Sequence, residues 1–371
     1  MRLAIICRPF VYYGGLETQT AGLVAEFVRQ GYDLHLYTPP GQRPLPGITH
    51  HRLPVLPRPA VARVLSFALA ARSVVRERFD VVQSHERTLS QDIYRAGEGC
   101  HRAYLEIKAR GLNRARRAAL RASPYHRALL ALERRLFTAE ARVRIVAISR
   151  RGKEEIHRLY RIPEPRLAVI YNGVDQERFT PDNRRRFRHA IRTEFGIPAE
   201  AWVTLFVGSG FERKGLGPLV EGFARLQDRG ARLLLLGKGS PARYRVTAAR
   251  LGLEGRVVWV GARPDVERFY AAADLVALPT RYEPFGNVHL EALAAGLPVL
   301  ASARSGGAEV VRHGETGWIL DDPEDPEAIA RGLEALRETD PARVTELGRR
   351  AAEPFTFAAQ AQAFTALYRS L

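Results

Sequence analysis

Short apolar runs alternate with helix-length amphipathic segments along this chain, and this alternation is what most restricts its fold. A first series of runs falls at 3–6, 33–37, 80–83 and 143–148, and a second at 203–207, 233–236, 257–260, 275–278 and 299–301. Strands separated by helices form right-handed crossover units in a parallel sheet. The turn-rich segment 172–175 separates the two series. The sequence therefore predicts an α/β chain of two doubly wound, Rossmann-like domains, 1–174 and 175–356, facing a central cleft.

The segments between the runs are assigned from the same periodicity and from helix start and stop signals. Helices are predicted at 17–30, 61–77, 218–227, 242–251, 266–272 and 287–295. Residues 39–59 are rich in proline and are predicted to be coil. Residues 104–140 are predicted to form a long, strongly basic helical region.

The totals restrict the class of protein. At 371 residues the chain has about twice the length of a usual domain. Its hydrophobic content of 46% and charged content of 26% are ordinary for a globular protein. No apolar run approaches ~18 residues and the N-terminus enters a strand at once, so we expect neither a membrane span nor a signal peptide. Cys7 and Cys100 are too few for a disulfide framework, which suits a reducing cytosol, and no zinc-type spacing occurs.

The net charge of +17 is the one abnormal total. Much of the excess is local to the first domain, at Arg102, Arg110, Arg114, Arg116, Arg117, Arg121, Arg127, Arg134, Arg135, Arg142, Arg144, Arg150 and Arg151. Such a surface attracts polyanions, whether anionic lipid, a phosphorylated glycolipid or nucleic acid. The alternative is a compositional bias towards arginine on solvated faces.

Two carboxylates lie eight residues apart where the strand at 275–278 meets the next helix. Glu283 falls in the loop after that strand, and Glu291 lies near the start of the helix that Gly296 ends. Open α/β sheets bind their ligands at the carboxyl ends of strands. An ionised carboxylate accepts several hydrogen bonds and can therefore hold sugar hydroxyls. The alternative for this pair is one helix-capping acid and one surface acid.

Other loops follow strands at the same kind of edge. Gly14 and Gly15 open the first helix, where backbone N–H groups can approach an anion. Arg213 and Lys214 follow the strand at 203–207, and a planar guanidinium beside a mobile ammonium suits a diphosphate. Ordinary turn glycines and a solvated basic loop are the alternatives.

The stretch from Glu283 to Glu291, with Phe285-Gly286 inside it and Gly296-Leu297-Pro298-Val299 behind it, resembles the signature of the retaining family 4 glycosyltransferases. The resemblance implies the GT-B fold, with the last helix, 357–371, crossing back to the first domain. It also implies a nucleotide-diphosphate sugar as donor substrate, with no metal and no other cofactor. The Asp-x-Asp triplet of metal-dependent transferases does not occur.

The resemblance also implies roles for individual residues. Arg213 and Lys214 would stabilise the departing nucleotide, and Glu283 would lie against the transferred sugar. The glycine pair of the first helix would lie over the diphosphate, Glu291 would bind the ribose, and two further loops would flank the nucleotide. The donor contacts so implied are Gly14, Gly15, Lys238, Arg263, Phe285, Gly286, Asn287, Val288 and Glu291. No covalent nucleophile is required.

Within the family, the likeness extends over the whole chain to the enzymes that glucosylate the first heptose of the lipopolysaccharide core. It implies transfer of a hexose, with UDP-glucose favoured, to a glycolipid or lipopolysaccharide-core acceptor. The enzyme would be cytoplasmic and peripheral on the inner face of the cytoplasmic membrane, its basic first domain against anionic lipid. The first-domain residue that faces the sugar is Glu98, His101 or His85, and Glu17 is a further acceptor-side candidate.

Two other functions fit single features of the sequence. Gly237-x-Gly239-x-x-Ala242 has the spacing of the fingerprint of NAD-dependent oxidoreductases, but Pro241 interrupts it and no acid stands about 20 residues on. The charge alone suggests a basic nucleic-acid-binding protein. No helix-turn-helix, zinc-finger or aromatic-rich sheet motif supports that function.

Overall fold

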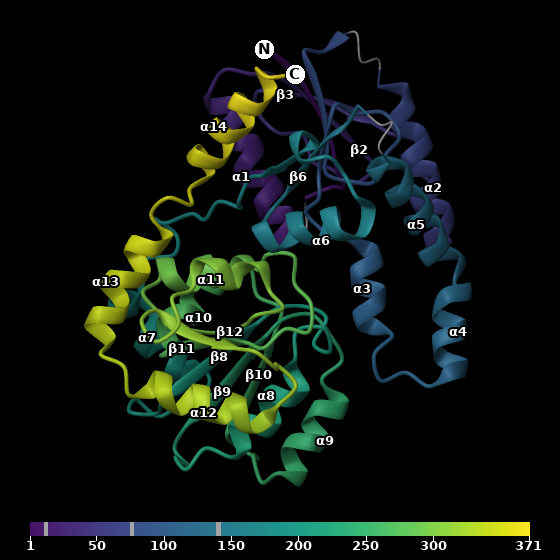
Figure 1. Ribbon diagram of the computed structural model, residues 1–371. Coiled ribbons are helices and arrows are strands. Elements are labelled where there is room, and N and C mark those ends of the chain that lie inside the picture. Colours follow the sequence, from purple (N-terminus) through teal and green to yellow (C-terminus); the bar gives the residue numbers. More distant parts are fainter. Residues whose placement is uncertain (11–13, 75–77, 139–141) are drawn as a thin grey trace. The chain divides into compact units, whose positions relative to one another are not determined.

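The computed structural model describes residues 1–10, 14–74, 78–138 and 142–371 and divides into two compact units (Figure 1). The N-terminal unit comprises Met1–Asn172 together with Phe357–Leu371, and the C-terminal unit comprises Gly173–Thr356. The boundary therefore falls two residues before the one predicted, inside the same turn-rich segment.

The N-terminal unit is built on a seven-stranded parallel sheet with strand order β3-β2-β1-β4-β5-β6-β7. Its strands are β1 (Arg2–Ile6), β2 (Asp33–Thr38), β3 (Ile48–Arg52), β4 (Val81–Ser84), β5 (Ile93–Arg95), β6 (Arg144–Ala147) and β7 (Leu167–Val169). The chain adds strands outward from β1 to β3 and then returns to the other side of β1 with β4. The sheet is thus doubly wound, and the order reverses between β1 and β4, where such sheets bind ligands.

The helices of this unit are α1 (Gly15–Arg29), α2 (Ala60–Ala70), α3 (His101–Lys108), α4 (Arg114–Ala122), α5 (Pro124–Phe137), α6 (Arg150–Tyr160) and α14 (Phe357–Tyr368). The basic helical region predicted over 104–140 consists of three separate helices, α3, α4 and α5. Gly111 takes a left-handed φ of +75° after α3, and the side chains of Asn113 and Ser123 cap the next two helices. The predicted last residue of this region, Glu140, lies outside the described residues.

Two other predictions for this unit are corrected. Residues 39–59 are not all coil, because β3 pairs in parallel with β2 from Ile48 to Arg52. The helix predicted over 61–77 ends at Ala70 and continues only as a 3-10 turn to Ser73. The end predicted at Glu77 lies outside the described residues.

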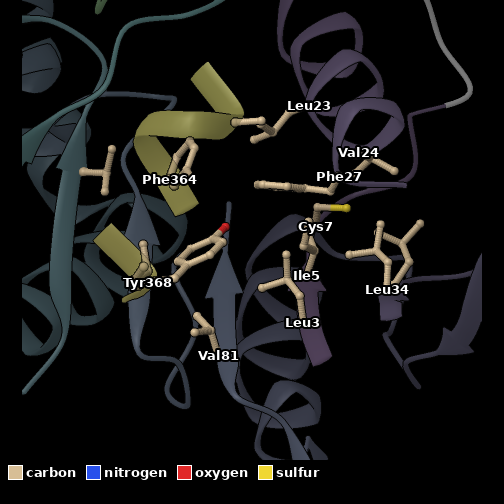
Figure 2. Close-up of a cluster of buried hydrophobic side chains, with 14 of the residues drawn as sticks. Leu3, Ile5, Cys7, Leu23, Val24, Phe27, Leu34, Val81, Phe364 and Tyr368 are labelled. Carbon is tan, nitrogen blue, oxygen red and sulfur yellow. The ribbon is translucent and has the colours of Figure 1, made fainter. Parts of the chain in front are cut away.

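The C-terminal helix completes the core of the N-terminal unit (Figure 2). Phe27 of α1 contacts two rings of α14, with ring centroids 6.4 Å from Phe364 and 5.9 Å from Tyr368. The Tyr368 hydroxyl donates to Oε1 of Gln83 in β4 at 2.6 Å. This cluster packs against one face of β1, β2 and β4, so the last residues of the chain help to bury the first strand.

The C-terminal unit is a six-stranded parallel sheet with order β10-β9-β8-β11-β12-β13. Its strands are β8 (Val203–Val207), β9 (Arg232–Leu236), β10 (Val257–Gly261), β11 (Leu275–Leu278), β12 (Val299–Ser302) and β13 (Gly317–Leu320). The first five confirm the predicted runs, and β13 was not predicted. The helices are α7 (Asn183–Glu194), α8 (Leu216–Ala224), α9 (Ala242–Arg250), α10 (Val266–Ala272), α11 (Asn287–Ala294), α12 (Pro326–Arg337) and α13 (Pro341–Ala352). Here the strand order reverses between β8 and β11.

A single carboxylate ties α7 to this sheet. Oδ1 of Asp274 accepts from Arg184 at 2.8 Å and from Arg188 at 2.9 Å, and Oδ2 accepts from Arg192 at 2.8 Å. The backbone N–H of Val203, at the start of β8, donates to Oδ2 at 2.9 Å. The arginines are spaced four residues apart and so lie on one face of α7. Asp274 therefore joins α7, β8 and β11 at the end of the sheet opposite the ligand edge.

Among the described residues, no helix has both the length and the apolar character that crossing a membrane requires.

Candidate active site

Two loops meet where the strand order of the C-terminal unit reverses. The loop from Gly208 to Gly215 joins β8 to α8, and the loop from Pro279 to Gly286 joins β11 to α11. Because β8 and β11 are parallel neighbours, both loops leave from the carboxyl edge of the sheet. The backbone N–H of Arg281 donates to the carbonyl of Arg213 at 2.8 Å and ties the loops together.

Glycine makes this approach possible. Gly215 takes a left-handed φ of +77°, and a Cβ at this position would lie 1.8 Å from the carbonyl oxygen of Pro279. Any other residue would push the two loops apart.

Three charged side chains predicted from the sequence converge at this corner. Oε2 of Glu283 accepts from Nη1 of Arg213 at 2.8 Å and from Nζ of Lys214 at 2.9 Å. Arg213 Nη1 also donates to the carbonyl of Tyr282 at 2.9 Å. The side chains of Lys214 and Glu283 are only 10% and 13% exposed, so the ion pairs are largely shielded from water.

The electrostatics of this cluster keep the carboxylate ionised. Burial alone would raise the pKa of Glu283, but the charges and hydrogen bonds of Lys214 and Arg213 outweigh it and lower the pKa to about 2. At neutral pH the cluster therefore holds two cations and one anion, a net positive charge at a strand-end corner.

Backbone pairing holds the Glu283 loop on its other side. The Glu283 N–H donates to the carbonyl of Arg304 at 3.3 Å, and the Gly306 N–H donates to the carbonyl of Glu283 at 3.0 Å. Both partners belong to the turn that follows β12. The loop is thus fixed between two neighbouring strand ends, and α11 begins directly after it at Asn287.

Glu291 lies in α11, at the position predicted for it. Its Oε2 accepts from the hydroxyl of Tyr270 at 2.6 Å, and its side chain is half-buried. Burial raises the pKa of Glu291, while the Tyr270 hydrogen bond and the charges of Arg178 and Lys214 act in the opposite direction. The Lys214 charge therefore acts on both carboxylates of the signature.

The two remaining basic candidates of this unit lie on its other strand-end loops. Lys238, after β9, is exposed, and its backbone N–H donates to Oγ of Ser209 at 3.3 Å. Arg263, after β10, forms two bonds of 2.9 Å with Asp265. Its guanidinium therefore pairs with a carboxylate two residues away in the same loop.

The glycines of the oxidoreductase-like fingerprint have a packing role. A Cβ at Gly237 would lie 1.9 Å from the carbonyl oxygen of Gly208, and one at Gly239 would lie 2.9 Å from the ring of Phe211. Both glycines let the loop after β9 pack closely against the loop after β8.

In the N-terminal unit, the predicted glycine pair opens α1. Gly14 is the N-cap residue, and a Cβ there would lie 2.3 Å from Oε2 of Glu17. The Glu17 carboxylate therefore folds back over the first turn of α1, where negative charge is favourable. The donor-side glycines and the acceptor-side candidate Glu17 thus occupy the same corner of this unit.

Glu98 is held between two arginines that the sequence argument missed. Its Oε1 accepts from Arg8 at 2.5 Å and its Oε2 from Arg87 at 2.9 Å. Burial would raise the pKa of Glu98, but the two guanidinium groups lower it to about 2. Arg8 also binds Glu86, and Arg87 binds the fully buried Glu133. Their position in the sequence could have identified them, since Arg8, Glu86 and Arg87 lie two or three residues after the ends of strands.

The two histidine candidates face into the unit. His85 Nδ1 contacts Oγ1 of Thr20 at 3.2 Å, and its Nε2 contacts the amide of Gln83 at 2.8 Å. His101 Nε2 contacts Nδ1 of His126 at 3.1 Å. Burial lowers the pKa of His85 well below its usual value and that of His101 to about 4. Among the three candidates, only Glu98 has a side chain that is substantially exposed, at 35%.

His289, in the first turn of α11, is another residue that was not predicted from the sequence. It is fully buried, and its Nδ1 lies 2.7 Å from the carbonyl oxygen of Gly286. The sequence around His289 did not indicate this role, because its contact with the Gly286 carbonyl depends on how the loop folds.

Among the described residues, no three histidine, cysteine or acidic side chains are grouped so that they could hold a metal ion.

The class of protein follows from comparison of the two units with known families. Residues 13–178 match the model described as Glycosyltransferase Family 4, and residues 187–353 match the model described as Glycosyl transferases group 1. The chain belongs to the family 4 glycosyltransferases, and its two parallel-sheet units have the GT-B fold.

Individual relatives match this chain to different extents. The chain is 24% identical over 349 residues to the lipopolysaccharide glucosyltransferase WaaG of Escherichia coli K12, covering 93% of this chain and 91% of that protein. It is 32% identical over 197 residues to the uncharacterized glycosyltransferase MJ1607 of Methanocaldococcus jannaschii, covering 52% of this chain. That match spans about half the length of MJ1607.

Solved structures show the same fold. The crystal structure of WaaG superposes with a TM-score of 0.83 at 24% identity, covering 99% of each chain. Anabaena Alr3699/HepE in complex with UDP-glucose superposes with a TM-score of 0.70 at 20% identity, covering 100% of each chain.

Proposed function

We propose that this chain is a retaining glycosyltransferase that transfers a hexose from a nucleotide-diphosphate sugar, with UDP-glucose favoured, to a glycolipid or lipopolysaccharide-core acceptor. The observation that carries the proposal is the convergence of Arg213, Lys214 and Glu283 at the carboxyl ends of β8 and β11. Support for the donor class comes from the neighbour HepE, whose structure holds UDP-glucose. Support for the acceptor class comes from the name of WaaG.

The proposed chemistry begins with the leaving group. When the bond between sugar and diphosphate breaks, negative charge grows on the diphosphate oxygens, and Arg213 and Lys214 stabilise that charge more in the transition state than in the ground state. Without donor, both cations are neutralised in part by Glu283. The diphosphate takes over these partners on binding.

Glu283 acts as an anion in this proposal. A carboxyl group with a pKa of about 2 is ionised at neutral pH and so does not serve as a proton donor. It accepts hydrogen bonds from the hydroxyls of the transferred sugar and stabilises positive charge at the reacting carbon. The donor phosphate itself accepts the proton of the attacking acceptor, so that neither a nucleophilic side chain nor a metal takes part.

Other residues complete the proposed donor and acceptor sites. Glu291 binds the ribose, and the loops that carry Lys238 and Arg263 flank the base. Of the first-unit candidates, Glu98 is the one we assign to the sugar, because its side chain is partly exposed while those of His85 and His101 are buried.

The basic face of the N-terminal unit supports a peripheral position on an anionic membrane. α4 carries Arg114, Arg116, Arg117 and Arg121, and none of its residues is buried. A solvated helix of this charge gains roughly 1 kcal/mol for each arginine near an anionic surface. We propose that α4 holds the enzyme at the inner face of the cytoplasmic membrane, where a glycolipid acceptor is reached.

Vesicle binding tests the membrane proposal. Arg116→Glu/Arg117→Glu should release the protein from vesicles that contain phosphatidylglycerol, whereas the matched reversal Arg185→Glu/Arg186→Glu on the exposed face of α7 should not. Equal losses for the two variants, or binding that α4 does not affect, would remove α4 from the proposal.

A donor panel tests the catalytic proposal. The protein is incubated with UDP-glucose, UDP-galactose, UDP-N-acetylglucosamine and ADP-glucose, each with a heptose-terminated lipopolysaccharide core and in the presence of EDTA. We expect transfer from UDP-glucose above the others, with the α configuration of the donor retained in the product by NMR. A β-linked product would contradict retention, and activity only with added manganese would contradict the metal-free mechanism.

A further inference from the structure

His289 makes an unusual pair of hydrogen bonds to one carbonyl. Its side-chain Nδ1 lies 2.7 Å from the carbonyl oxygen of Gly286, and its own backbone N–H donates to the same oxygen at 3.0 Å. Burial lowers the pKa of His289 to about 4, so the ring is neutral at pH 7. Because a carbonyl only accepts, Nδ1 is the protonated nitrogen.

The preceding carbonyl is also bound twice. The carbonyl oxygen of Phe285 accepts from Oγ of Ser305 at 2.8 Å and from the backbone N–H of Gly307 at 2.6 Å. In a trans peptide the C=O and the following N–H point in opposite directions. The N–H groups of Gly286 and Asn287 therefore point away from the turn and the imidazole that hold these carbonyls.

The imidazole fits between two glycines. A Cβ at Gly286 would lie 2.7 Å from His289 Nδ1, and a Cβ at Gly307 would lie 2.6 Å from the same atom. Gly286 also takes a left-handed φ of +88°. The ring thus occupies the space that two side-chain stems would need, and it joins α11 to the turn after β12.

Packing alone does not explain an imidazole here. Its second nitrogen, Nε2, has no hydrogen-bond partner among the described residues although the side chain is fully buried. An unsatisfied buried acceptor costs stability, and a leucine of similar volume would avoid that cost. The bond from Nδ1 to Gly286 is the gain that offsets it.

We infer that His289 is a positioning residue: it fixes the peptide between Gly286 and Asn287, so that the amides at the start of α11 are held ready for the donor. This inference rests on the proposed function and on the donor contacts at Gly286 and Asn287 that the family resemblance implies. Amides fixed in advance need no reorganisation when charge develops.

Two variants separate the hydrogen bond from the bulk of the ring. In His289→Asn the amide nitrogen can take the place of Nδ1 and keep the bond to Gly286. In His289→Leu the space stays filled but the donor is lost. If the leucine variant does not fold, His289→Met replaces it, since a thioether chain adapts to irregular spaces.

Two readouts are taken from each variant. The first is steady-state transfer from UDP-glucose, compared with the Kd of UDP from calorimetry. The second is hydrogen exchange of the peptide that spans 283–290, which requires no ligand. We expect His289→Leu to lower kcat/KM by about tenfold or more and to speed exchange in this peptide, with the Kd of UDP changed less than about threefold. His289→Asn should stay within about threefold of the wild type in every readout.

Two results would overturn the inference: an asparagine variant as impaired as the leucine variant, or a leucine variant that matches the wild type in both readouts. A wild-type protein that transfers no sugar would instead overturn the proposed function. In that case the exchange comparison alone decides whether His289 fixes the loop.

Discussion

At the scale of single residues, Arg213 and Lys214 share Glu283 as their partner. A bound anion could take the place of this carboxylate. Each cation lies within 3 Å of the same carboxylate oxygen. Removing one partner of such a shielded group leaves uncompensated charge. The cluster should therefore respond both to pH and to substitution in ways that an exposed ion pair would not.

The pH response follows from the pKa of Glu283, which is about 2 in the folded protein against 4.5 ordinarily. A depressed folded pKa contributes stability above pH 4.5 and loses it as pH falls towards 2, by about 3 kcal/mol in all. Urea unfolding of the wild type and Glu283→Gln should thus show a stability difference that shrinks between pH 7 and pH 3.5. A constant difference across that range would mean that Glu283 does not titrate with these partners.

Loss of Lys214 should weaken nucleotide binding. Lys214→Ala removes a charge-assisted hydrogen bond to the diphosphate, which costs roughly 1.5–3 kcal/mol, or about a 10- to 150-fold higher Kd. Lys238→Ala is the control, because the Lys238 side chain is exposed and should cost less than tenfold. Calorimetry with UDP that shows equal effects for the two lysines would count against the role of Lys214.

The place of a candidate site residue in the fold was predictable where that residue follows a strand closely in the sequence. Arg213, Lys214 and Glu283 each follow a recognisable apolar run, so the sequence placed them at the sheet edge. His289 was not predictable, because its role depends on Gly307 in a distant loop. The pairing of Glu98 with Arg8 likewise depends on which strands become neighbours.

At the scale of elements, the helices of the C-terminal unit are held to the sheet by specific polar contacts as well as by apolar burial. Asp274 is the clearest case, since one carboxylate accepts from three arginines of α7 and from the start of β8. Its side chain is 14% exposed and Arg192 only 3%.

Asp274→Asn should therefore destabilise the C-terminal unit by about 3 kcal/mol, because it leaves the buried charge of Arg192 without its counter-ion. The control is Asp182→Asn, an exposed residue at the start of α7 that makes no capping bond. Thermal and urea unfolding measure the stability of both variants. A loss of stability no larger than that of the control would show that the backbone carbonyls around Arg192 are enough to stabilise its charge.

Strands that form a continuous apolar run were predictable. Leu275–Leu278 is apolar throughout and buried on both faces, and its run identified it. β3 has the sequence Ile-Thr-His-His-Arg and lies at the edge of its sheet beside β2 alone. An edge strand needs no continuous apolar run. β3 can therefore be recognised only from its pairing with β2 in the structure.

At the scale of the whole molecule, the first and last residues of the chain belong to the same compact unit. Phe364 is fully buried against Phe27 although 337 positions separate them in the sequence. The resemblance implied that the last helix returns to the first domain, but no pattern within 357–371 specifies which helix it meets.

Phe364→Ala should destabilise the N-terminal unit by about 3–5 kcal/mol through the cavity it creates. Leu371→Ala, at an exposed position, is the matched control and should be close to neutral. Hydrogen exchange should accelerate in β1 and β4, while the Kd of UDP at the C-terminal unit stays unchanged. Faster exchange in β8 or β11 instead would contradict the division into two units.

A crystal structure of the protein soaked with UDP-glucose would show whether Arg213, Lys214 and Glu283 hold a sugar linked to a diphosphate. If they do, we expect diphosphate oxygens within hydrogen-bond distance of Arg213 and Lys214, with the glucose hydroxyls against Glu283. A nucleotide bound elsewhere, with both ion pairs to Glu283 undisturbed, would contradict this expectation.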